Sequence, residues 1–285
     1  MSERDNVNGS TNLIDDVFAR LKASGETALI PFLTMGDPDL DTSVDLIEAA
    51  ERAGAHIIEI GVPYSDPLAD GPVIQRAAER ALRNRVSMMD CIGIGAKART
   101  RGVKMPFILF SYFNPAYQLG LDKFFSLLRE NDFSGVILPD LPLEEDAETR
   151  AYADKYGIHL IPLVAPTSEA RVERIAAQAR GFVYCVSSLG VTGVRSTFHE
   201  GIDAFLDTVR RAATVPICIG FGISTREHAE RFASRCDGVV VGSAIVRQVE
   251  EALPLLTSSS EEEHKRGVQA VEQFISDLKP RTANV

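Results

Sequence analysis

The feature that most constrains the fold is a regular alternation of short apolar runs with amphipathic helical segments along the 285-residue chain. Nearly every apolar run is followed by a segment with helical periodicity, and no change of composition marks a linker. Parallel strands need crossover helices, and eight such units close into a barrel of about 250 residues. The pattern therefore predicts an α/β fold, a (β/α)8 TIM barrel. The eight expected strands lie at 28–35, 56–62, 106–112, 135–140, 159–165, 182–187, 216–221 and 239–241.

Two helices are expected in addition to these units. Residues 12–23 have the apolar period of an extra N-terminal helix, and a short extra helix is expected near 244–250, after strand eight. Pro72 suits the first turn of the helix that follows the second strand. Ser224, with Glu227 three residues later, has the spacing of a capping box and predicts another helix start.

An open, doubly wound sheet is the competing architecture. Such sheets usually have fewer strands and a glycine-rich first turn, whereas the Gly-Asp-Pro at 36–38 does not match that motif. We therefore expect a single barrel domain at 12–278. A disordered lead-in is expected at 1–11, and a frayed C-terminal tail at 279–285.

The net charge argues against some classes of partner, and the cysteine content indicates the cellular compartment. The formal net charge is −10, and such an acidic balance argues against nucleic acid or an anionic membrane as the main partner. No apolar segment approaches the roughly 18–20 residues of a membrane span, and the N-terminus has no apolar signal region. The four cysteines show no Cys-x-x-Cys spacing and are expected to be buried free thiols. The sequence thus predicts a cytoplasmic protein.

Carboxylates stand out at the end of the second strand. Glu59 lies inside an apolar run that is expected to be buried, where an ionisable group is costly unless it is paired or its pKa moves. Asp66 and Asp70 follow on the next loop, and a pair of carboxyls at a strand end suits acid/base chemistry. The alternative is structural: Glu59 as part of a polar barrel layer, and both aspartates as turn residues. We retain Asp66 as a turn residue.

Small residues after the last two strands predict an anion site. Gly220 and Gly222 follow strand seven, and Gly242 and Ser243 open the helix after strand eight, which is where TIM barrels bind phosphate. Gly193 is a candidate for one more backbone donor, although such glycines can also serve tight packing. Further polar residues at strand ends are Tyr112, Asp140 and Tyr184. The five histidines show no ligand spacing, so no metal is expected.

The loop after the second strand also carries a family resemblance. Residues 58–75, Ile-Glu-Ile-Gly-Val-Pro-Tyr-Ser-Asp-Pro-Leu-Ala-Asp-Gly-Pro-Val-Ile-Gln, resemble the signature of the tryptophan synthase alpha subunit family. The similarity covers about residues 12 to 278, and the loop motif is far more specific than the glycine motifs. Other matching segments are 31–38, 139–142, 190–193, 220–224 and 242–246.

The resemblance implies a lyase of L-tryptophan biosynthesis that cleaves indole-3-glycerol phosphate to indole and glyceraldehyde 3-phosphate by a retro-aldol reaction. It implies that Glu59 protonates indole C3 and then helps to deprotonate the glycerol hydroxyl. Asp70 would accept the indole N–H and stabilise positive charge on the ring. The residues expected to bind phosphate are Gly193, Gly222, Gly242 and Ser243, and those expected to wall the pocket are Phe32, Ile74, Tyr112, Tyr184 and Phe221.

The resemblance also implies a partner. The family pairs with a beta subunit that uses pyridoxal phosphate, and indole passes through a tunnel in an αββα complex; no cofactor is expected in this chain. Loops 64–70 and 188–197 would close the site and communicate with the partner, with Asp140 and Thr192 in the switching region. Ser188 stands where many members have Arg, which leaves the details of loop closure open.

Three alternatives remain at the level of the sequence. One is a stand-alone indole-3-glycerol-phosphate lyase that releases free indole, and another is a non-catalytic subunit that activates a partner enzyme. The third is a different phosphate-binding barrel, such as a sugar-phosphate isomerase, which would lack the 63–72 loop. Intact Glu59 and Asp70 argue against the non-catalytic alternative.

Overall fold

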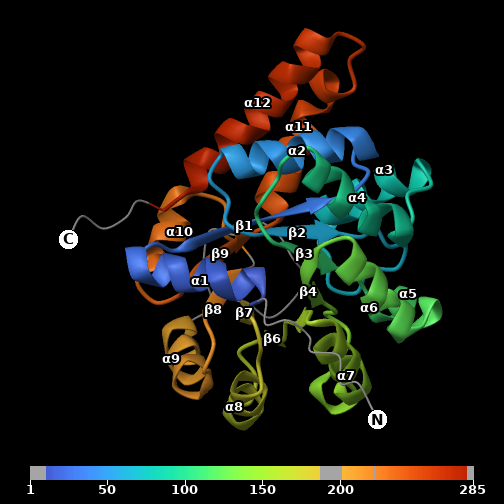
Figure 1. The fold of residues 1–285 in the computed structure, drawn as a ribbon. Helices are drawn as coiled ribbons and strands as arrows, with labels where there is room; N and C mark the ends of the chain where they lie inside the picture. The colour runs from blue at the N-terminus through green and yellow to red at the C-terminus, as the bar shows by residue number, and fades with distance from the viewer. Residues whose placement is uncertain (1–10, 187–200, 221, 281–285) are drawn as a thin grey trace.

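A ring of parallel strands forms the centre of the molecule, with helices around it (Figure 1). The computed structural model describes residues 11–186, 201–220 and 222–280. In this part of the chain the strand order is β5-β4-β3-β2-β1-β9-β8-β7-β6, and all pairs are parallel. The strands are β1 (Ala28–Thr34), β2 (Ile58–Gly61), β3 (Phe107–Phe110), β4 (Phe133–Ile137), β5 (His159–Leu160), β6 (Leu163–Val164), β7 (Val183–Val186), β8 (Ile217–Gly220) and β9 (Gly238–Val241).

The ring closes through the expected fifth strand, which is interrupted. The Ile161 N–H donates to the Val136 carbonyl on one side, at 2.9 Å, and the Tyr184 N–H donates to the Pro162 carbonyl on the other, at 3.0 Å. Pro162 has no N–H to donate, so regular pairing breaks there and the run divides into β5 and β6. The prediction of an eight-stranded (β/α)8 barrel is confirmed, with its fifth strand in two pieces.

Helices cover the outside of the barrel, and most follow the expected strands. They are α1 (Leu13–Ser24), α2 (Leu40–Arg52), α3 (Pro72–Arg83), α4 (Met88–Thr100), α5 (Phe113–Leu119), α6 (Leu121–Glu130), α7 (Ala147–Tyr156), α8 (Glu169–Ala177), α9 (Ile202–Ala212), α10 (Arg226–Ala233), α11 (Ser243–Leu256) and α12 (Glu261–Leu278), with a 3-10 turn, η1 (Leu143–Glu145). The sequence did not predict α5. The helix after the last strand was expected to be short, but α11 has 14 residues.

Helix starts test two of the local predictions. Pro72 occupies the first turn of α3, as predicted. The predicted capping box at Ser224 is wrong by one residue: Thr225 is the N-cap of α10, and its hydroxyl accepts from the His228 N–H at 3.2 Å. The Ser224 hydroxyl instead lies 3.4 Å from the His228 Nδ1 atom. Two neighbouring hydroxyl residues compete for the cap, and spacing alone does not choose between them.

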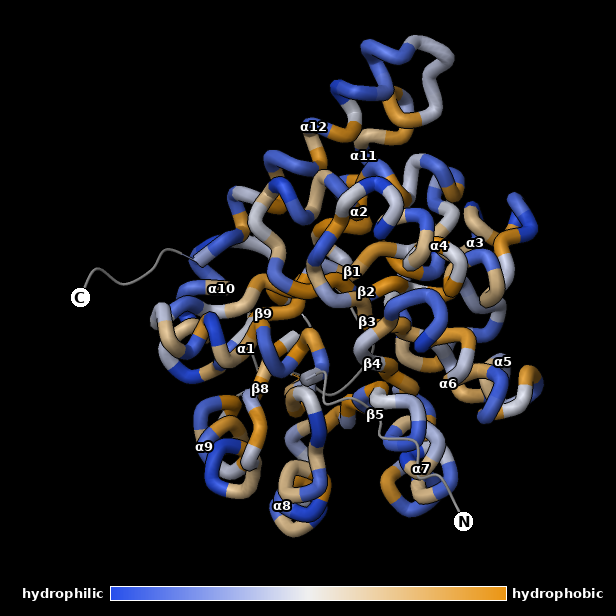
Figure 2. Tube along the Cα trace, viewed as in Figure 1, coloured by the Kyte–Doolittle hydropathy of each residue, from blue (hydrophilic) through white to orange (hydrophobic). Residues whose placement is uncertain are grey.

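The extra N-terminal helix closes one end of the barrel. Ile14, Phe18 and Leu21 of α1 are buried and pack with Ile57 and Phe182, which belong to the inner face of the strands. Figure 2 shows the hydrophobic residues concentrated on the strands and on the inward sides of the helices. Because α1 fills the amino-terminal end, the carboxyl-terminal ends of the strands are left for a site.

The predictions for the chain ends fall mostly outside the described residues, since 1–10 and 281–285 are not described. The lead-in and tail therefore stay predictions, as does the 12–278 domain boundary. No helix in the described ranges is long and apolar enough to span a membrane.

Candidate active site

Glu59 is buried inside the barrel with an oxygen that has no partner. Alternation along β2 turns Glu59 to the same side as Ile57, and only 1% of the side chain is exposed. Among the described residues, no group hydrogen-bonds to its Oε1 atom. Burial raises the pKa of Glu59 to about 8, so this carboxyl is mostly protonated at neutral pH. An unpaired acid of this kind is poised to give a proton to a bound molecule.

Asp70 lies at the end of the loop that follows β2, and its surroundings are different. The side chain is 8% exposed and hydrogen-bonds to the Tyr112 hydroxyl. Burial raises the pKa of Asp70 to about 6, while the hydrogen bond from Tyr112 opposes this rise. Asp70 is therefore mostly ionised at neutral pH. One strand and its loop thus provide an acid and an anion.

Tyr112 contacts the loop that follows β2 and stabilises its position. Its hydroxyl accepts from the Ala69 N–H at 3.0 Å, and its ring stacks on Tyr64 with 4.8 Å between centroids. The sequence predicted Tyr112 as a pocket wall, yet it is not among the residues that line the cavity. Asp66 is exposed and accepts from the Ser65 hydroxyl at 2.8 Å, which fits the turn residue expected there.

Glu59 and Asp70 line one small cavity at the carboxyl-terminal end of the barrel. Its apolar wall includes the predicted Phe32, Ile74 and Tyr184. The Phe32 ring meets Phe110 edge to face, with 5.5 Å between centroids. A mostly apolar cavity with two carboxyl groups suits an aromatic ring that carries an N–H. The cavity is also lined by Ala69, Phe110, Pro139, Gly222, Ile223, Val240, Gly242 and Ser243.

Phe110 and Ile223 are lining residues that the sequence analysis missed. Phe110 ends β3 opposite Gly61, and a side chain on Gly61 would lie 2.4 Å from the Phe32 ring. Phe110 was within reach of the sequence, because it lies two residues before Tyr112 in the same expected strand. Ile223 follows two loop glycines, and no periodic signal identifies it.

The same cavity also has the features of an anion site. Gly222, Gly242 and Ser243 line it, and α11 begins at Ser243. The first backbone N–H groups of a helix have no partner within the helix, and the dipole favours an anion there. Gly193, Thr192 and Phe221 lie outside the described residues, as does Ser188. The predicted phosphate residues that are described therefore meet in one place.

The packing alternative for these glycines applies to one of them and not to another. A Cβ atom on Gly220 would lie 2.3 Å from the Tyr184 hydroxyl, so close packing requires glycine there. A Cβ atom on Gly242 would meet nothing closer than 3.7 Å, which is ordinary contact. Packing thus accounts for Gly220 and leaves Gly242 to be explained by its place at the helix start.

Asp140 lies at the edge of the site. Its Oδ1 atom accepts from the Phe113 N–H at 2.8 Å and ties the turn after β4 to the start of α5. Asp140 lines a second, larger cavity over the ends of β4 to β6, and this cavity shares Ala69 and Pro139 with the first. Asp140 therefore contacts the backbone of a neighbouring unit and not the two catalytic candidates.

Metal and thiol chemistry have no visible basis in the described part of the chain. Within it, no group of three or more His, Cys, Asp or Glu side chains is arranged to hold a metal ion. All four cysteines are free and buried, as the sequence predicted. Burial raises the pKa of the Cys91 thiol and of the other three, so they are unreactive packing residues.

Comparison with known proteins finds similarity to members of one family. A family model described as the tryptophan synthase alpha chain matches residues 18–282. The tryptophan synthase alpha chain of Bacillus pumilus (strain SAFR-032) is 49% identical over 255 residues, which is 89% of this chain and 96% of that protein. The alpha chain of Geobacillus kaustophilus (strain HTA426) is 53% identical over 234 residues, 82% of this chain and 87% of that protein.

Solved structures agree with the sequence comparisons. Tryptophan synthase subunit alpha from Legionella pneumophila str. Paris superposes with a TM-score of 0.85 at 33% identity, covering 97% of this chain and all of that one. A chain of Mycobacterium tuberculosis tryptophan synthase gives a TM-score of 0.81 at 32% identity, covering 94% of this chain and 99% of that one.

Proposed function

The chain belongs to the tryptophan synthase alpha chain family, and on that premise we propose how its own residues carry out the reaction. It is a lyase of tryptophan biosynthesis, which cleaves indole-3-glycerol phosphate to indole and glyceraldehyde 3-phosphate by a retro-aldol reaction. The observation that carries the residue assignment is the shared cavity, which a protonated acid, an anion and a helix start all line.

Glu59 acts as the acid and then as the base. Indole C3 is a poor leaving carbanion until it is protonated, so the first step needs a proton donor. Glu59 gives its proton to C3, which is supported by its raised pKa and by its unpaired Oε1 atom. The resulting carboxylate then takes the proton of the hydroxyl on the neighbouring glycerol carbon. The carbon–carbon bond breaks, its electron pair restores the aromatic ring, and the hydroxyl carbon becomes the aldehyde, so Glu59 ends protonated as it began.

Asp70 stabilises the ring while it is positive. Its carboxylate accepts the indole N–H and faces the charge that develops when C3 is protonated. This assignment is supported by its pKa of about 6, which keeps it ionised where Glu59 is protonated. The hydrogen bond from Tyr112 favours the ionised form and holds the carboxylate in position.

The phosphate group binds at the opposite end. Gly242 and Ser243 present backbone N–H groups at the start of α11, and Gly222 approaches from the turn after β8. We propose Gly193 as a further donor, and Phe32, Ile74, Tyr112, Tyr184 and Phe221 as residues that shape or support the indole and glycerol pocket. Asp140 and Thr192 are proposed for loop switching; for Asp140, support comes from its bond to the Phe113 backbone.

The partner is a tryptophan synthase beta chain, and we propose an αββα complex in which indole passes between subunits. Support comes from large apolar side chains exposed near the mouth of the barrel: Leu68, on the loop that bears Asp70, is 79% exposed, and Tyr117 on α5 is 62% exposed. Such side chains are typical of interfaces. In this proposal pyridoxal phosphate belongs to the beta chain alone. A cytoplasmic location is supported by the four free thiols.

The test is an indole-release assay with the purified chain, alone and with a tryptophan synthase beta chain. We expect slow release of indole from indole-3-glycerol phosphate by the isolated chain and a large increase when the beta chain is added. Full activity alone, unchanged by the beta chain, would favour the stand-alone lyase. No release under either condition would overturn the assignment.

A further inference from the structure

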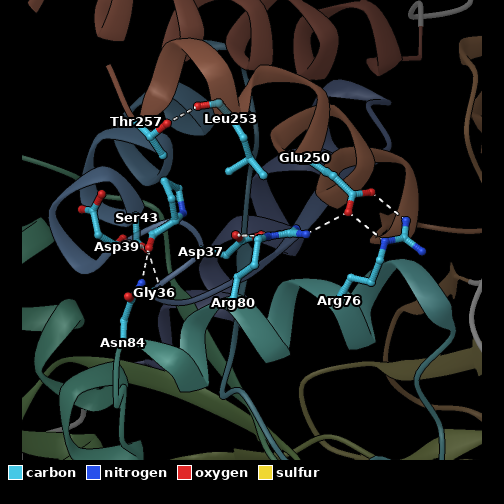
Figure 3. Close-up of polar contacts among 11 residues, drawn as sticks. Gly36, Asp37, Asp39, Ser43, Arg76, Arg80, Asn84, Glu250, Leu253 and Thr257 are labelled. Carbon is cyan, nitrogen blue, oxygen red and sulfur yellow. Dashed lines mark hydrogen bonds and ion pairs between the residues drawn. The ribbon is translucent and has the colours of Figure 1, made fainter. Parts of the chain in front are cut away.

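Four charged side chains form a network between α3, α11 and the loop after β1 (Figure 3). Arg80 of α3 donates from Nε and Nη2 to the two carboxylate oxygens of Asp37, at 2.7 and 2.9 Å. Its third nitrogen, Nη1, donates to Glu250 of α11 at 2.8 Å. Arg76, one turn earlier on α3, donates twice to the same Glu250, at 2.8 and 2.7 Å. One guanidinium thus bridges two carboxylates from different elements.

The network joins three of the elements that contribute to the cavity wall: the end of β1, α3 and α11. Asp37 follows β1, the strand that carries Phe32. Arg80 lies on α3, which begins two residues after Asp70 and also carries Ile74. Glu250 lies on α11, whose first residue is Ser243. The indole end and the phosphate end of the cavity are therefore linked through one set of ion pairs.

None of the four side chains lines the cavity itself. Glu250 lies about two helical turns from Ser243, or roughly 10 Å along the axis, and Arg80 is a similar distance into α3. A contribution of this network to catalysis has to act through the positions of the two helix starts. α3 and α11 pack against each other, and their side chains Ile74 and Val246 meet in one apolar cluster.

These ion pairs are expected to contribute little to the stability of the fold and more to the relative positions of the elements that they join. Asp37 is only 2% exposed, and taking a carboxylate out of water offsets much of what its pairing contributes. Replacing a buried ion pair with apolar residues is often neutral for stability, whereas a bidentate fork fixes distance and angle. Asn84 adds a further tie, because its side chain donates to the Pro38 carbonyl and fixes the end of α3 to the same loop.

We propose that Asp37, Arg80, Glu250 and Arg76 form a positioning network that sets the spacing between the indole-binding and phosphate-binding ends of the cavity, with Arg80 as its central residue. The inference rests on the proposed function. It predicts a selective defect: a ligand that spans both ends needs the correct spacing, whereas a ligand that occupies one end does not.

Binding of two ligands to the full chain, with the beta chain present, tests this. The spanning ligand is a non-cleavable indole joined to a phosphate by an alkyl chain, and the one-ended ligand is glyceraldehyde 3-phosphate. In Arg80→Met we expect Kd for the spanning ligand to rise about tenfold, and Kd for the one-ended ligand to stay within about twofold. Arg80→Lys should restore part of the loss, because an ammonium group keeps the charge but lacks the planar fork that bridges both carboxylates.

The matched control is Arg52→Met. This variant removes another ion pair between two helices, in which Arg52 donates two hydrogen bonds to Glu272. That pair joins α2 to α12 away from the cavity, and both Kd values should stay unchanged. If Arg80→Met does not fold, Glu250→Gln weakens the links from Arg76 and Arg80 to α11 with no change of size and leaves the Arg80–Asp37 pair in place. Equal weakening of both ligands, or no weakening of either, would overturn the proposal.

The outcome also separates this proposal from the proposed function. If the unaltered chain releases no indole but the spanning ligand is bound selectively worse by Arg80→Met, the reaction is wrong and the network stands. If the unaltered chain releases indole and Arg80→Met binds both ligands normally, the network alone is wrong. Denaturant unfolding of each variant checks that a change in Kd does not follow from partial unfolding.

Discussion

Two titratable side chains lie near each other on the second strand segment, His56 two residues before β2 and Glu59 within it, and their surroundings differ. At the amino-terminal end, the His56 Nδ1 atom accepts from the Leu29 N–H at 3.0 Å, and the His56 N–H donates to the Leu29 carbonyl at 3.0 Å. Inside β2, the Glu59 Oε1 atom has no hydrogen-bond partner in the described part of the chain. Burial, aided by Lys279, lowers the pKa of His56 to about 4, and burial raises the pKa of Glu59 to about 8.

Both side chains are therefore uncharged near pH 7, but their roles differ. His56 is satisfied by its neighbour strand and serves the pairing of β1 with β2. The Oε1 atom of Glu59 is buried without a partner among the described residues, a condition that persists in proteins where a ligand or a reaction uses the group. The difference teaches that Glu59 combines deep burial with an oxygen that no described residue satisfies, and that both properties set it apart from the partly buried, hydrogen-bonded His56.

Replacing Glu59 should have the largest effect. In Glu59→Gln we expect indole release to fall by about 1000-fold, or about 4 kcal/mol of transition-state stabilisation, because an amide cannot donate and retake the proton. Steady-state assays measure this. Turnover within tenfold of the unaltered chain would contradict the assignment of Glu59.

The same Glu59→Gln variant, although less active, should gain folding stability relative to the unaltered chain as pH rises. The folded-state pKa of Glu59 lies above its unfolded value, so its contribution is complete at low pH and is lost as pH rises toward about 8. Glu59→Gln should thus become more stable than the unaltered chain as pH rises from about 5 to about 8. Urea unfolding across this range is the measurement, and a constant difference would contradict the raised pKa.

The pH dependence of turnover comes next. Catalysis needs Glu59 protonated and Asp70 ionised, so the rate of the chemical step should fall below pH about 6 and above pH about 8. Each limb should approach a tenfold loss per pH unit. In Asp70→Asn, whose residual activity is expected to be low, the acid limb should disappear while the alkaline limb remains.

Changes at His56 should affect folding and not chemistry. In His56→Ala the Leu29 N–H loses its acceptor, which costs about 1–3 kcal/mol of stability, while turnover per folded molecule stays the same. Urea unfolding and active-site-normalised assays measure the two. A loss of turnover with unchanged stability would reverse the comparison with Glu59.

His56→Asn is the matched control, since its amide oxygen can take the place of Nδ1. The folded-state pKa of His56 is depressed, so its stabilising contribution is present above pH about 6.5 and is lost as pH falls toward about 4. His56→Asn should retain most of the stability and lose this part of the acid dependence. An unchanged pH profile would mean that His56 does not titrate as described.

The smallest effects are expected at Gly220 and Gly242. These two glycines repeat the comparison of a structural residue with a site residue, but neither of them titrates. Gly220→Ala should cost about 1–3 kcal/mol of stability, because the Tyr184 hydroxyl must move. Gly242→Ala should cost under about 1 kcal/mol of stability. It should raise KM about threefold to tenfold by crowding the helix start. Equal losses of stability in both variants would remove the distinction between them.

Much of the fold followed from local patterns. The alternation of apolar runs with helical segments predicted the barrel, and the period of β2 turned Glu59 inward. The break in the fifth strand was not anticipated, although Pro162 is the cause. The start of α10 was misplaced by one residue, because Ser224 and Thr225 are both good caps and only the backbone path selects one.

The site was predictable in part for the same reason. Glu59, Asp70, Gly242 and Ser243 stand at strand ends, and a barrel brings strand ends together. The supporting function of Tyr112 was not predictable, since its contact with Ala69 joins two different units. Phe110 was one alternation away from a residue that was identified.

By itself, the sequence determined which elements form, which faces are buried and where small residues and carboxyls end the strands. These properties depend on neighbours within a few positions, and periodicity records them. Tertiary structure alone decided that His56 is paired and Glu59 is not, and that Arg80 bridges Asp37 and Glu250. Those facts depend on partners far apart in the chain, and burial and pairing, which set the protonation state, are properties of the packed molecule.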